Sequence, residues 1–237
     1  MAKGRRQKKY RPSWDLERDV RKRARDPGLL VVGVDEVGVG ALAGPVMAAA
    51  VALSGGEPWL DGLDDSKRLT SKRREEMHAM IVGTALAFGV GYATHEEVDD
   101  VGIASARRLA VVRAFRDCKE ALGCYAAAVV DDRRLAWIRS DLGGRASIFA
   151  DKADQRSYSV AAASIVAKVV RDRHMRKMAL MWPLYDFGRN VGYGTPRHLA
   201  ALREHGPCPL HRRSFGPLKS MAEKAPARRA GARPAKV

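Results

Sequence analysis

The sequence has 237 residues, of which 46% are hydrophobic and 30% are charged, with a formal net charge of +16. This composition is typical of a globular chain with an apolar core, and it excludes a wholly disordered protein. The sequence has no apolar run of the roughly 18–20 residues that span a bilayer, and no apolar signal core follows its basic N-terminus. We therefore expect a cytoplasmic chain that does not associate with membranes.

Most of the positive charge lies at the two ends of the chain. Residues 1–27 carry a net charge of +7 and residues 218–237 carry +5, which leaves +4 for residues 28–217. We predict a basic, flexible N-terminal arm over 1–27, with at most a short helix around Trp14–Arg25 that lacks a large apolar face. We predict a folded domain over 28–217 and a basic, disordered tail over 218–237. Such a charge suggests a polyanionic partner, with nucleic acid ahead of an anionic membrane.

The middle of the chain alternates between strand and helix patterns. Short apolar, β-branched runs predict strands, and apolar residues at helical spacing predict helices. Strands are predicted at Leu29–Val34, Val46–Leu53, Leu86–Ala93 and Ala126–Val130, and helices at Ser71–Val82, Ile103–Leu122 and Ser157–Met181. The first two strands form a predicted hairpin. This order favours an α/β fold with a central mixed β-sheet flanked by helices.

Carboxylates follow the ends of these apolar elements. Asp35 and Glu36 come directly after the first strand, Asp131 follows the fourth, and one more, Asp172, lies on the last long helix. Functional groups gather at strand ends in open α/β sheets, and clustered carboxylates repel one another unless cations neutralise them. Oxygen ligands without a Cys or His cluster suit Mg²⁺ or Mn²⁺, and two such ions can promote phosphodiester cleavage.

Two alternatives stay open for these acids. Each of them alone is more often a helix cap or a surface residue than a metal ligand. Adjacent residues on a regular strand also point to opposite faces. Asp35 and Glu36 can therefore serve one site only if the strand ends or twists there, which Gly38 would permit.

Three further features are candidates for ligand contact. The loop Gly38-Val39-Gly40 can bring backbone N–H groups close to a ligand, or it is a simple hairpin turn. Lys67, in a polar loop, is suited to a phosphate, or its loop only caps the next helix. Tyr193, between two glycines, is suited to stacking on a sugar or base, or it packs. The cysteines Cys118, Cys124 and Cys208 form no CxxC pair, which indicates free thiols in a reducing compartment.

Five segments of the chain occur together in one order. They are GVDEVGVGALAGPVMAAAV, LDDSKRLTSKRRE, VVDD, SVAAASIVAKVVRDRHM and GYGTPRHLAALREHGPCPLHRRSF. With them, the chain from about Leu29 to Pro217 resembles the ribonuclease HII family, the type 2 ribonucleases H. The resemblance implies a ribonuclease H-like fold with a small C-terminal helical region, and it makes residues 28–217 the catalytic domain.

The resemblance implies an endonuclease that cleaves the RNA strand of RNA–DNA hybrids. It also implies nicking of duplex DNA 5′ of embedded ribonucleotides, which leaves a 3′-hydroxyl and a 5′-phosphate. We therefore expect a monomer that uses Mn²⁺ or Mg²⁺ and removes ribonucleotides from DNA in replication and repair. One alternative is a catalytically weak nucleic-acid-binding protein of the same fold. Another is a different metal-dependent nuclease, such as a junction resolvase.

The family's motifs assign roles to individual residues of this chain. The catalytic, metal-binding acids fall on Asp35, Glu36, Asp131 and Asp172. The phosphate-contacting lysine falls on Lys67, and the tyrosine that stacks on the sugar next to the ribonucleotide falls on Tyr193. The substrate-reading loop falls on Gly38, Val39 and Gly40, whose backbone would meet the 2′-hydroxyl that distinguishes RNA from DNA. No covalent intermediate is implied, so Cys208 and Ser214 receive no catalytic role.

The chain departs from the family's pattern at three places. Val39 stands where the family has arginine, so we predict weaker substrate binding or a changed preference between single ribonucleotides and longer RNA runs. Arg189-Asn190-Val191 stands where a His-Lys pair is common, which removes one basic contact near the tyrosine. Asp154 follows Ala153 where the family often has a Gly-Asp step. We interpret Asp154 as a supporting or helix-starting residue.

Overall fold

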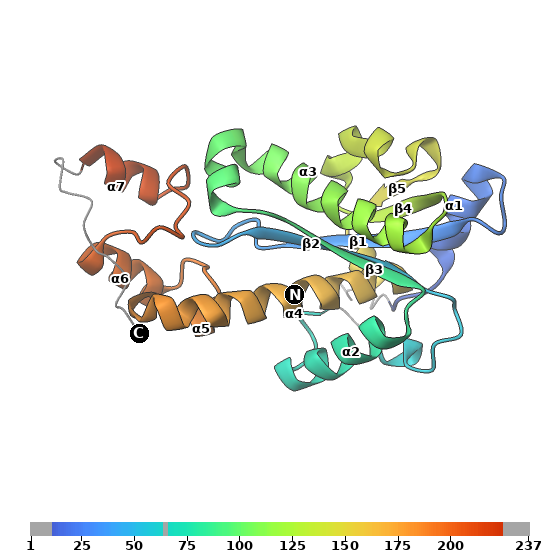
Figure 1. The fold of residues 1–237 in the computed structure, drawn as a ribbon, viewed down its shortest axis with the longest axis horizontal. Coiled ribbons are helices and arrows are strands. Elements are labelled where there is room, and N and C mark those ends of the chain that lie inside the picture. The colour runs from blue at the N-terminus through green and yellow to red at the C-terminus, as the bar shows by residue number, and fades with distance from the viewer. Residues whose placement is uncertain (1–10, 64–65, 225–237) are drawn as a thin grey trace, which may run out of the picture.

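Five strands form a mixed sheet at the centre of the computed structural model, which describes residues 11–63 and 66–224 (Figure 1). The strand order is β3-β2-β1-β4-β5. The pairs β1–β2 and β2–β3 are antiparallel, whereas β1–β4 and β4–β5 are parallel. The strands are β1 (Leu30–Val37), β2 (Val46–Ala52), β3 (Ala87–Ala93), β4 (Ala126–Asp131) and β5 (Ile148–Ala150).

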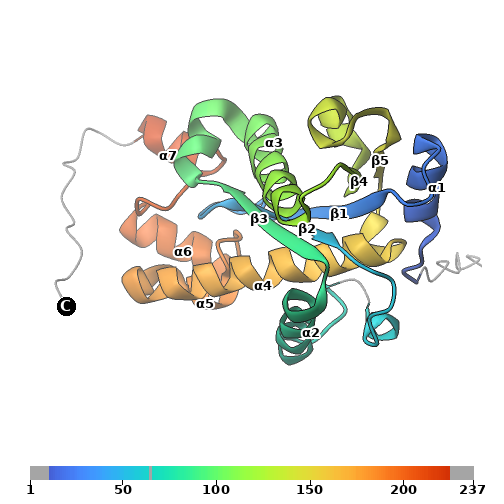
Figure 2. The same ribbon diagram turned by 45° about the vertical axis from the view of Figure 1, so that its right-hand side comes forward.

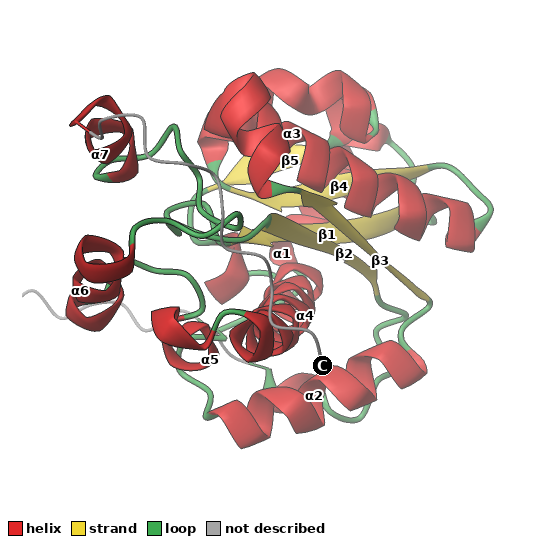
Figure 3. Ribbon diagram, turned by 60° about the vertical axis from the view of Figure 1, so that its left-hand side comes forward, coloured by secondary structure: helices red, strands yellow, loops and turns green. Residues whose placement is uncertain are grey.

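Helices cover both faces of this sheet. One face packs on α3, and the other packs on α4, which α2 flanks (Figure 3). The short helices α5, α6 and α7 gather at one end of the molecule, and α1 lies at the other (Figure 2). The helices are α1 (Asp15–Ala24), α2 (Ser71–Thr84), α3 (His95–Leu122), α4 (Tyr158–Met181), α5 (Phe187–Asn190), α6 (Pro196–His205) and α7 (Leu218–Lys224). The α/β fold class with a central mixed sheet and a small C-terminal helical region is confirmed.

The alternation of side chains along β1 decides which helix each acid faces. Val32 and Val34 belong to the core beneath α3. Gly33 faces α4, because a Cβ there would lie 2.1 Å from the backbone of Ser159. Successive residues of a strand point to opposite faces, so Asp35 is directed to the α4 face and Glu36 to the α3 face. The glycine lets the start of α4 approach the sheet closely.

The predicted elements differ from the observed ones mainly at their ends. The predicted helix start at Ile103 coincides with a break, since Gly102 has φ 77° and a separate helical segment precedes it from His95. Gly123 ends this helix in the left-handed conformation, as its position after Leu122 suggested. The sequence patterns did not predict β5, which has three residues, or the 3₁₀ segment Arg133–Leu142.

The second half of the N-terminal arm is not a flexible segment. It forms α1, whose Leu16 and Val20 are buried against β4 and β5. Glu17 is fully buried and accepts hydrogen bonds from the hydroxyls of Ser157 and Ser159 at 2.6 and 2.7 Å. The hydrophobic pattern of the sequence did not predict that α1 packs on the domain, because much of this contact is made by polar groups such as Glu17. Residues 1–10 lie outside the described part.

The first part of the predicted C-terminal tail is helical. Residues 218–224 form α7, and Leu218 is buried in the cluster that also contains Phe187 and Leu202. The remaining predicted tail, 225–237, lies outside the described residues. Over the ranges that the structure describes, every helix is too short or too polar to cross a bilayer.

Candidate active site

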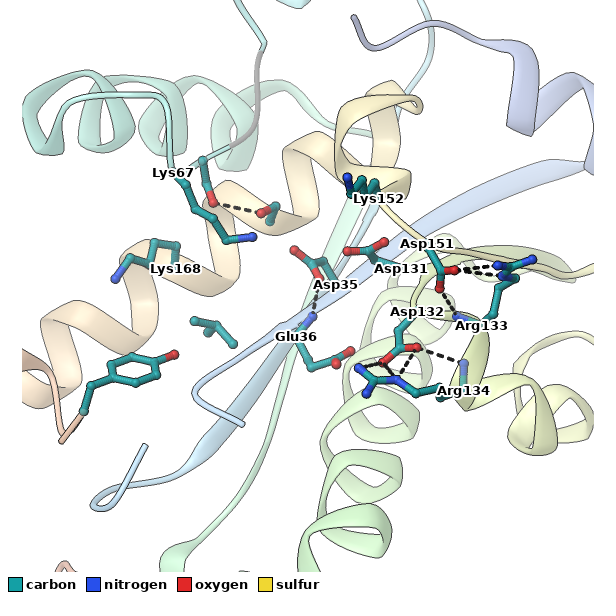
Figure 4. A pocket seen from close by; sticks show the side chains of 14 residues that line it. Asp35, Glu36, Lys67, Asp131, Asp132, Arg133, Arg134, Asp151, Lys152 and Lys168 are labelled. Carbon is teal, nitrogen blue, oxygen red and sulfur yellow. Dashed lines mark hydrogen bonds and ion pairs between the residues drawn. The ribbon is translucent and has the colours of Figure 1, made fainter. Parts of the chain in front are cut away.

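A cavity of about 820 Å³ opens where the carboxyl ends of β1 and β4 meet α4 (Figure 4). The strands β1 and β4 are parallel and therefore end at the same edge of the sheet, so the side chains at their carboxyl ends lie close together. The cavity combines acids with lysines and arginines. Its lining consists of Asp35, Glu36, Val37, Ser66, Lys67, Asp131, Asp132, Arg133, Arg134, Asp151, Lys152, Ser164, Lys168 and Tyr193.

Asp35 and Asp131, two of the four acids singled out in the sequence, lie side by side in this cavity (Figure 4). Burial and the repulsion of Glu36 and Asp131 raise the pKa of Asp35 well above its ordinary value. Burial also raises the pKa of Asp131, although the backbone N–H of Ala153 donates to its Oδ1 at 2.7 Å. These two carboxyls share a site in which negative charge is poorly neutralised, so a cation is the natural partner.

Glu36 reaches the cavity from the opposite face of β1. Its carboxylate turns toward Asp132 and away from Asp35 (Figure 4). Arg107 of α3 donates to Glu36 Oε1, while Glu36 Oε2 is buried without a hydrogen-bond partner. Burial raises the pKa of Glu36 to about 7 against the attraction of Arg107. The sequence patterns missed Arg107 and Asp132, and only the adjacency of Asp132 to Asp131 could have indicated the latter.

Asp172 is the predicted acid that does not line the cavity. It is buried on α4, where Lys168 Nζ lies 2.7 Å from its Oδ1. Ser164 and Lys168, which lie two turns and one turn before Asp172 on the same helix, both line the cavity. The structure therefore brings Asp35, Glu36 and Asp131 to one cavity and holds Asp172 in an ion pair at its border.

Lys67 lies across the cavity from β1 (Figure 4). Its Nζ is 3.9 Å from Asp154 Oδ2, and its side chain is 79% exposed. Asp154 is buried in the 3₁₀ turn that precedes α4, which agrees with its interpretation as a supporting residue. The neighbouring hydroxyls of Ser66 and Ser164 are 2.9 Å apart and fasten the loop to α4. A lysine in this position can reach a phosphate that enters the cavity.

Arg171 of α4 fixes the loop between β1 and β2. It is fully buried and donates to the carbonyls of Ala43, Pro45 and Val191 at 3.3, 3.0 and 2.9 Å. Gly38 has φ 86°, and a Cβ there would lie 2.2 Å from Arg171 Nε. Glycine at position 38 is thus required both by the backbone conformation and by the arginine behind it.

Arg212 supports the same loop from the C-terminal region. It is also fully buried, and it donates to the carbonyls of Gly44 and Val39 at 2.9 and 3.0 Å. The Val39 side chain packs at the edge of the core beneath α3. Gly38, Val39 and Gly40 do not line the cavity themselves, and a Cβ at Gly40 would meet no atom within 4 Å.

Tyr193 reaches the cavity from a loop that is held on several sides. Its ring is part-exposed and lies over the Arg171 guanidinium, 5.6 Å from the ring centroid. Before it, buried Asn190 accepts from the N–H of Gly192 at 2.8 Å and donates to the carbonyl of Tyr185 at 2.7 Å. The segment 189–191, which departs from the family pattern, therefore braces the loop through an amide.

A chain of neutral imidazoles holds the Tyr193 backbone. His198 Nδ1 lies 2.9 Å from the Tyr193 carbonyl, which can only accept, so this nitrogen carries the proton. His198 Nε2 then accepts from His211 Nε2 at 2.9 Å, and His211 Nδ1 accepts from the Cys208 N–H at 3.0 Å. Burial lowers the pKa of both histidines, that of His211 to about 4. Cys208 is thus a structural partner, and burial raises the pKa of its thiol to about 11.

The acids of the cavity fit a hard divalent cation in their chemistry. Carboxylate oxygens are the ligands that Mg²⁺ and Mn²⁺ prefer, and the unpartnered Glu36 Oε2 is a donor atom left for such an ion. As the side chains stand within residues 11–63 and 66–224, no three His, Cys, Asp or Glu already surround a common point. Glu36 and Asp172 are instead engaged by Arg107 and Lys168.

Comparison with known proteins decides the family. The sequence model of ribonuclease HII matches residues 32–217. A ribonuclease HII of Burkholderia mallei is 47% identical over 198 residues, which cover 81% of this chain and 86% of the relative. The chain belongs to the ribonuclease HII family. It is therefore a ribonuclease H, a metal-dependent nuclease that hydrolyses phosphodiester bonds.

Solved structures of the family share the fold. The PCNA:RNase HII complex from Archaeoglobus fulgidus contains a chain that is 30% identical, with a TM-score of 0.65 over 79% of this chain and 95% of that one. The ribonuclease H2 from Pyrococcus horikoshii is 25% identical, with a TM-score of 0.65 over 82% of this chain and 98% of that one. The family match runs from Val32 in β1 to Pro217, the residue before α7, so α1 lies before it.

Proposed function

We propose that this ribonuclease H cleaves the RNA strand of RNA–DNA hybrids and nicks duplex DNA on the 5′ side of embedded ribonucleotides. The products would be a 3′-hydroxyl and a 5′-phosphate. The observation that carries this proposal is the pairing of Asp35 with Asp131 in an open cavity whose walls also present Lys67, Lys168 and Tyr193. Acids for cations, lysines for phosphates and an aromatic ring for a sugar are then combined in one place.

We propose that the acids together hold two divalent ions, which are Mg²⁺ or Mn²⁺. Asp35 and Asp131 would hold them from the α4 face of the sheet, and Glu36 Oε2 would contribute from the α3 face. Asp172 would join when Lys168 moves to the substrate phosphate. When bound, the ions supply the Lewis acidity that phosphodiester hydrolysis needs.

Recognition is assigned to the other walls. Lys67 and Lys168 would place the scissile phosphate near Asp35 by charge attraction. Tyr193 would stack on the sugar beside the ribonucleotide. The backbone of Gly38, Val39 and Gly40 would reach the 2′-hydroxyl once the substrate lies against the loop, because Arg171 and Arg212 keep the neighbouring carbonyls directed inward.

The setting of this activity is also part of the proposal. We place the enzyme in the cytoplasm as a monomer that removes ribonucleotides from DNA. The cysteines of the described chain are free thiols, which suits a reducing compartment. The net charge of +16 suits a nucleic acid partner.

The test is cleavage of four substrates under the same conditions with Mg²⁺ or Mn²⁺. They are duplex DNA with one ribonucleotide, an RNA–DNA hybrid, all-DNA duplex and an all-DNA four-way junction. We expect cleavage of the first two only, with the single-ribonucleotide duplex cut on the 5′ side of the ribonucleotide. Cutting of the junction would favour a resolvase, and binding without any cutting would favour a non-catalytic binding protein.

A further inference from the structure

Arg107 is a largely buried cation that enters the active-site region from α3. Its side chain is 11% exposed, and it lies between Glu36 and Asp132, whose side chains are 8% and 13% exposed. It belongs to the helix on the opposite side of the sheet from Asp35 and Asp131. None of the family motifs in the chain includes it, and it lies 71 residues from Glu36 in the sequence.

The contact with Glu36 uses only half of the carboxylate. Arg107 donates to Glu36 Oε1 through Nε, at 3.1 Å, and through Nη2. Glu36 Oε2 is buried and has no hydrogen-bond partner. A buried carboxylate oxygen without a partner is costly, so its persistence beside two other acids indicates that another cation completes its coordination.

The contact with Asp132 holds an unusual backbone. Asp132 has φ 84° and ψ 108°, a backbone conformation that residues other than glycine rarely adopt. Arg107 Nη2 donates to its Oδ2 at 2.7 Å, and the Arg134 N–H donates to its Oδ1 at 2.8 Å. Such strain persists only where surrounding contacts over-determine it. Asp132 directly follows Asp131, so Arg107 joins the end of β4 to the end of β1.

We propose that Arg107 is a positioning residue for the divalent-cation site, because its fork clamps Glu36 Oε1 and Asp132 and so presents Glu36 Oε2 to the cation. This inference rests on the proposed metal site. The clamp needs the geometry of arginine, since one guanidinium serves two carboxylates through Nε and Nη2. Lysine keeps the charge but offers a single flexible ammonium.

The experiment is calorimetric titration of the full chain with Mn²⁺ at fixed pH and without nucleic acid. Arg107→Lys keeps the net charge, so a change in affinity reports the lost fork. We expect about 10- to 100-fold weaker binding, the usual effect of losing a residue that orients a metal ligand. Arg108→Lys is the matched control, because Arg108 follows on the same helix and pairs with Asp141. It should bind Mn²⁺ as the wild type does.

A second pair of variants tests the other end of the clamp. Asp132→Asn removes an Arg107 anchor, and Asp151→Asn removes the same charge from the same cavity at an acid that pairs with Arg133 instead. We expect Asp132→Asn to weaken Mn²⁺ binding clearly more than Asp151→Asn. This pair decides the question if Arg107→Lys does not fold, as judged by its circular dichroism.

Two outcomes overturn the inference. One is a folded Arg107→Lys variant that binds Mn²⁺ as tightly as the wild type or more tightly, which would make Arg107 a competitor of the cation. The other is equal weakening by Asp132→Asn and Asp151→Asn. Asp35→Asn separates this inference from the proposed function. If Asp35→Asn also binds Mn²⁺ as tightly as the wild type, the metal site itself is misplaced. If Asp35→Asn loses Mn²⁺ binding while Arg107→Lys keeps it, only the role of Arg107 is refuted.

Discussion

The acidic end of the active-site cavity, formed by Asp35, Glu36 and Asp131, contrasts electrostatically with its C-terminal wall, by which we mean Tyr193 and the buried arginines Arg171 and Arg212 behind it. At the acidic end, Asp35, Glu36 and Asp131 crowd together, and burial helps to raise the pKa of each of them. At the C-terminal wall, the buried cations Arg171 and Arg212 donate to backbone carbonyls. In the first region, the charged forms of the acids are disfavoured until cations bind. The second uses buried positive charge to shape a backbone.

This difference separates chemistry from recognition. A cluster of acids can take part in catalysis once it binds cations, and losing one of these ligands should impair catalysis. A backbone held by arginines can read a substrate without offering any reacting group. We therefore expect substitutions at the acidic end to stop cleavage and spare binding. Substitutions at the C-terminal wall should alter stability or substrate choice.

The largest effect is expected for Asp131→Asn. The variant keeps the shape of the side chain and removes one charge that would hold a divalent ion. The cleavage rate should fall by at least about 10²-fold, as when one group that stabilises transition-state charge is lost. Duplex binding in a gel-shift assay should persist. If the variant lost duplex binding together with cleavage, the assignment of cleavage and binding to different regions would be contradicted.

Arg171→Met tests the C-terminal wall. It leaves two buried carbonyls and one partly buried carbonyl without their donor. Each unpaired buried group costs about 1–3 kcal/mol, so the free energy of unfolding should fall by about 3 kcal/mol or more. Arg173→Met, on the same helix, removes a half-exposed arginine that pairs with Glu75. It should cost at most about 1 kcal/mol. Urea denaturation measures both, and equal losses would show that Arg171 is no special brace.

The pH dependence of stability tests the acidic end. The pKa of Glu36 is about 7 in the folded chain against an ordinary 4.5, so the folded state holds this proton more tightly. Without divalent ions, stability should therefore decline as pH rises from about 4.5 to about 7. The decline should be smaller in Glu36→Gln. The measurement is the unfolding temperature of the wild type and of Glu36→Gln across this pH range. If the unfolding temperature depends on pH in the same way in both proteins, Glu36 does not cause the decline.

Val39→Arg tests recognition at the glycine loop. It restores the side chain that the family has there, next to a carbonyl that Arg212 already holds. We expect tighter binding or a several-fold change in the ratio of rates on single-ribonucleotide duplex and RNA–DNA hybrid. Steady-state kinetics on both substrates gives this ratio. Unchanged rates on both would show that the loop reads the substrate through its backbone alone.

The smallest effect is expected from the chain ends. Residues 1–10 and 225–237 carry nine Lys and Arg and no Asp or Glu. Removing them, while keeping α1, should flatten the dependence of duplex affinity on salt, because fewer counterions are released. The cleavage position should not move. A shifted position would mean that the ends contribute to recognition.

Sequence reasoning predicted much of the fold because apolar periodicity is strong in the sheet and in α4. It selected Asp35, Glu36 and Asp131 because functional groups gather at strand ends in open α/β sheets. It could not find Arg107, whose pairing with Glu36 depends on how α3 crosses the sheet. It also missed the anchoring of α1, because Glu17 is a polar residue buried by partners far along the chain.

The most direct test of the central claim is Asp35→Asn on duplex DNA that contains one ribonucleotide. Asp35 faces Asp131 in the cavity, and repulsion from its acidic neighbours indicates a site made for cations. Cleavage and binding should be measured on the same preparation with Mg²⁺ or Mn²⁺. The account predicts a variant that binds the duplex and does not cut it. Cleavage at the wild-type rate by Asp35→Asn would contradict the assignment of chemistry to the acidic end.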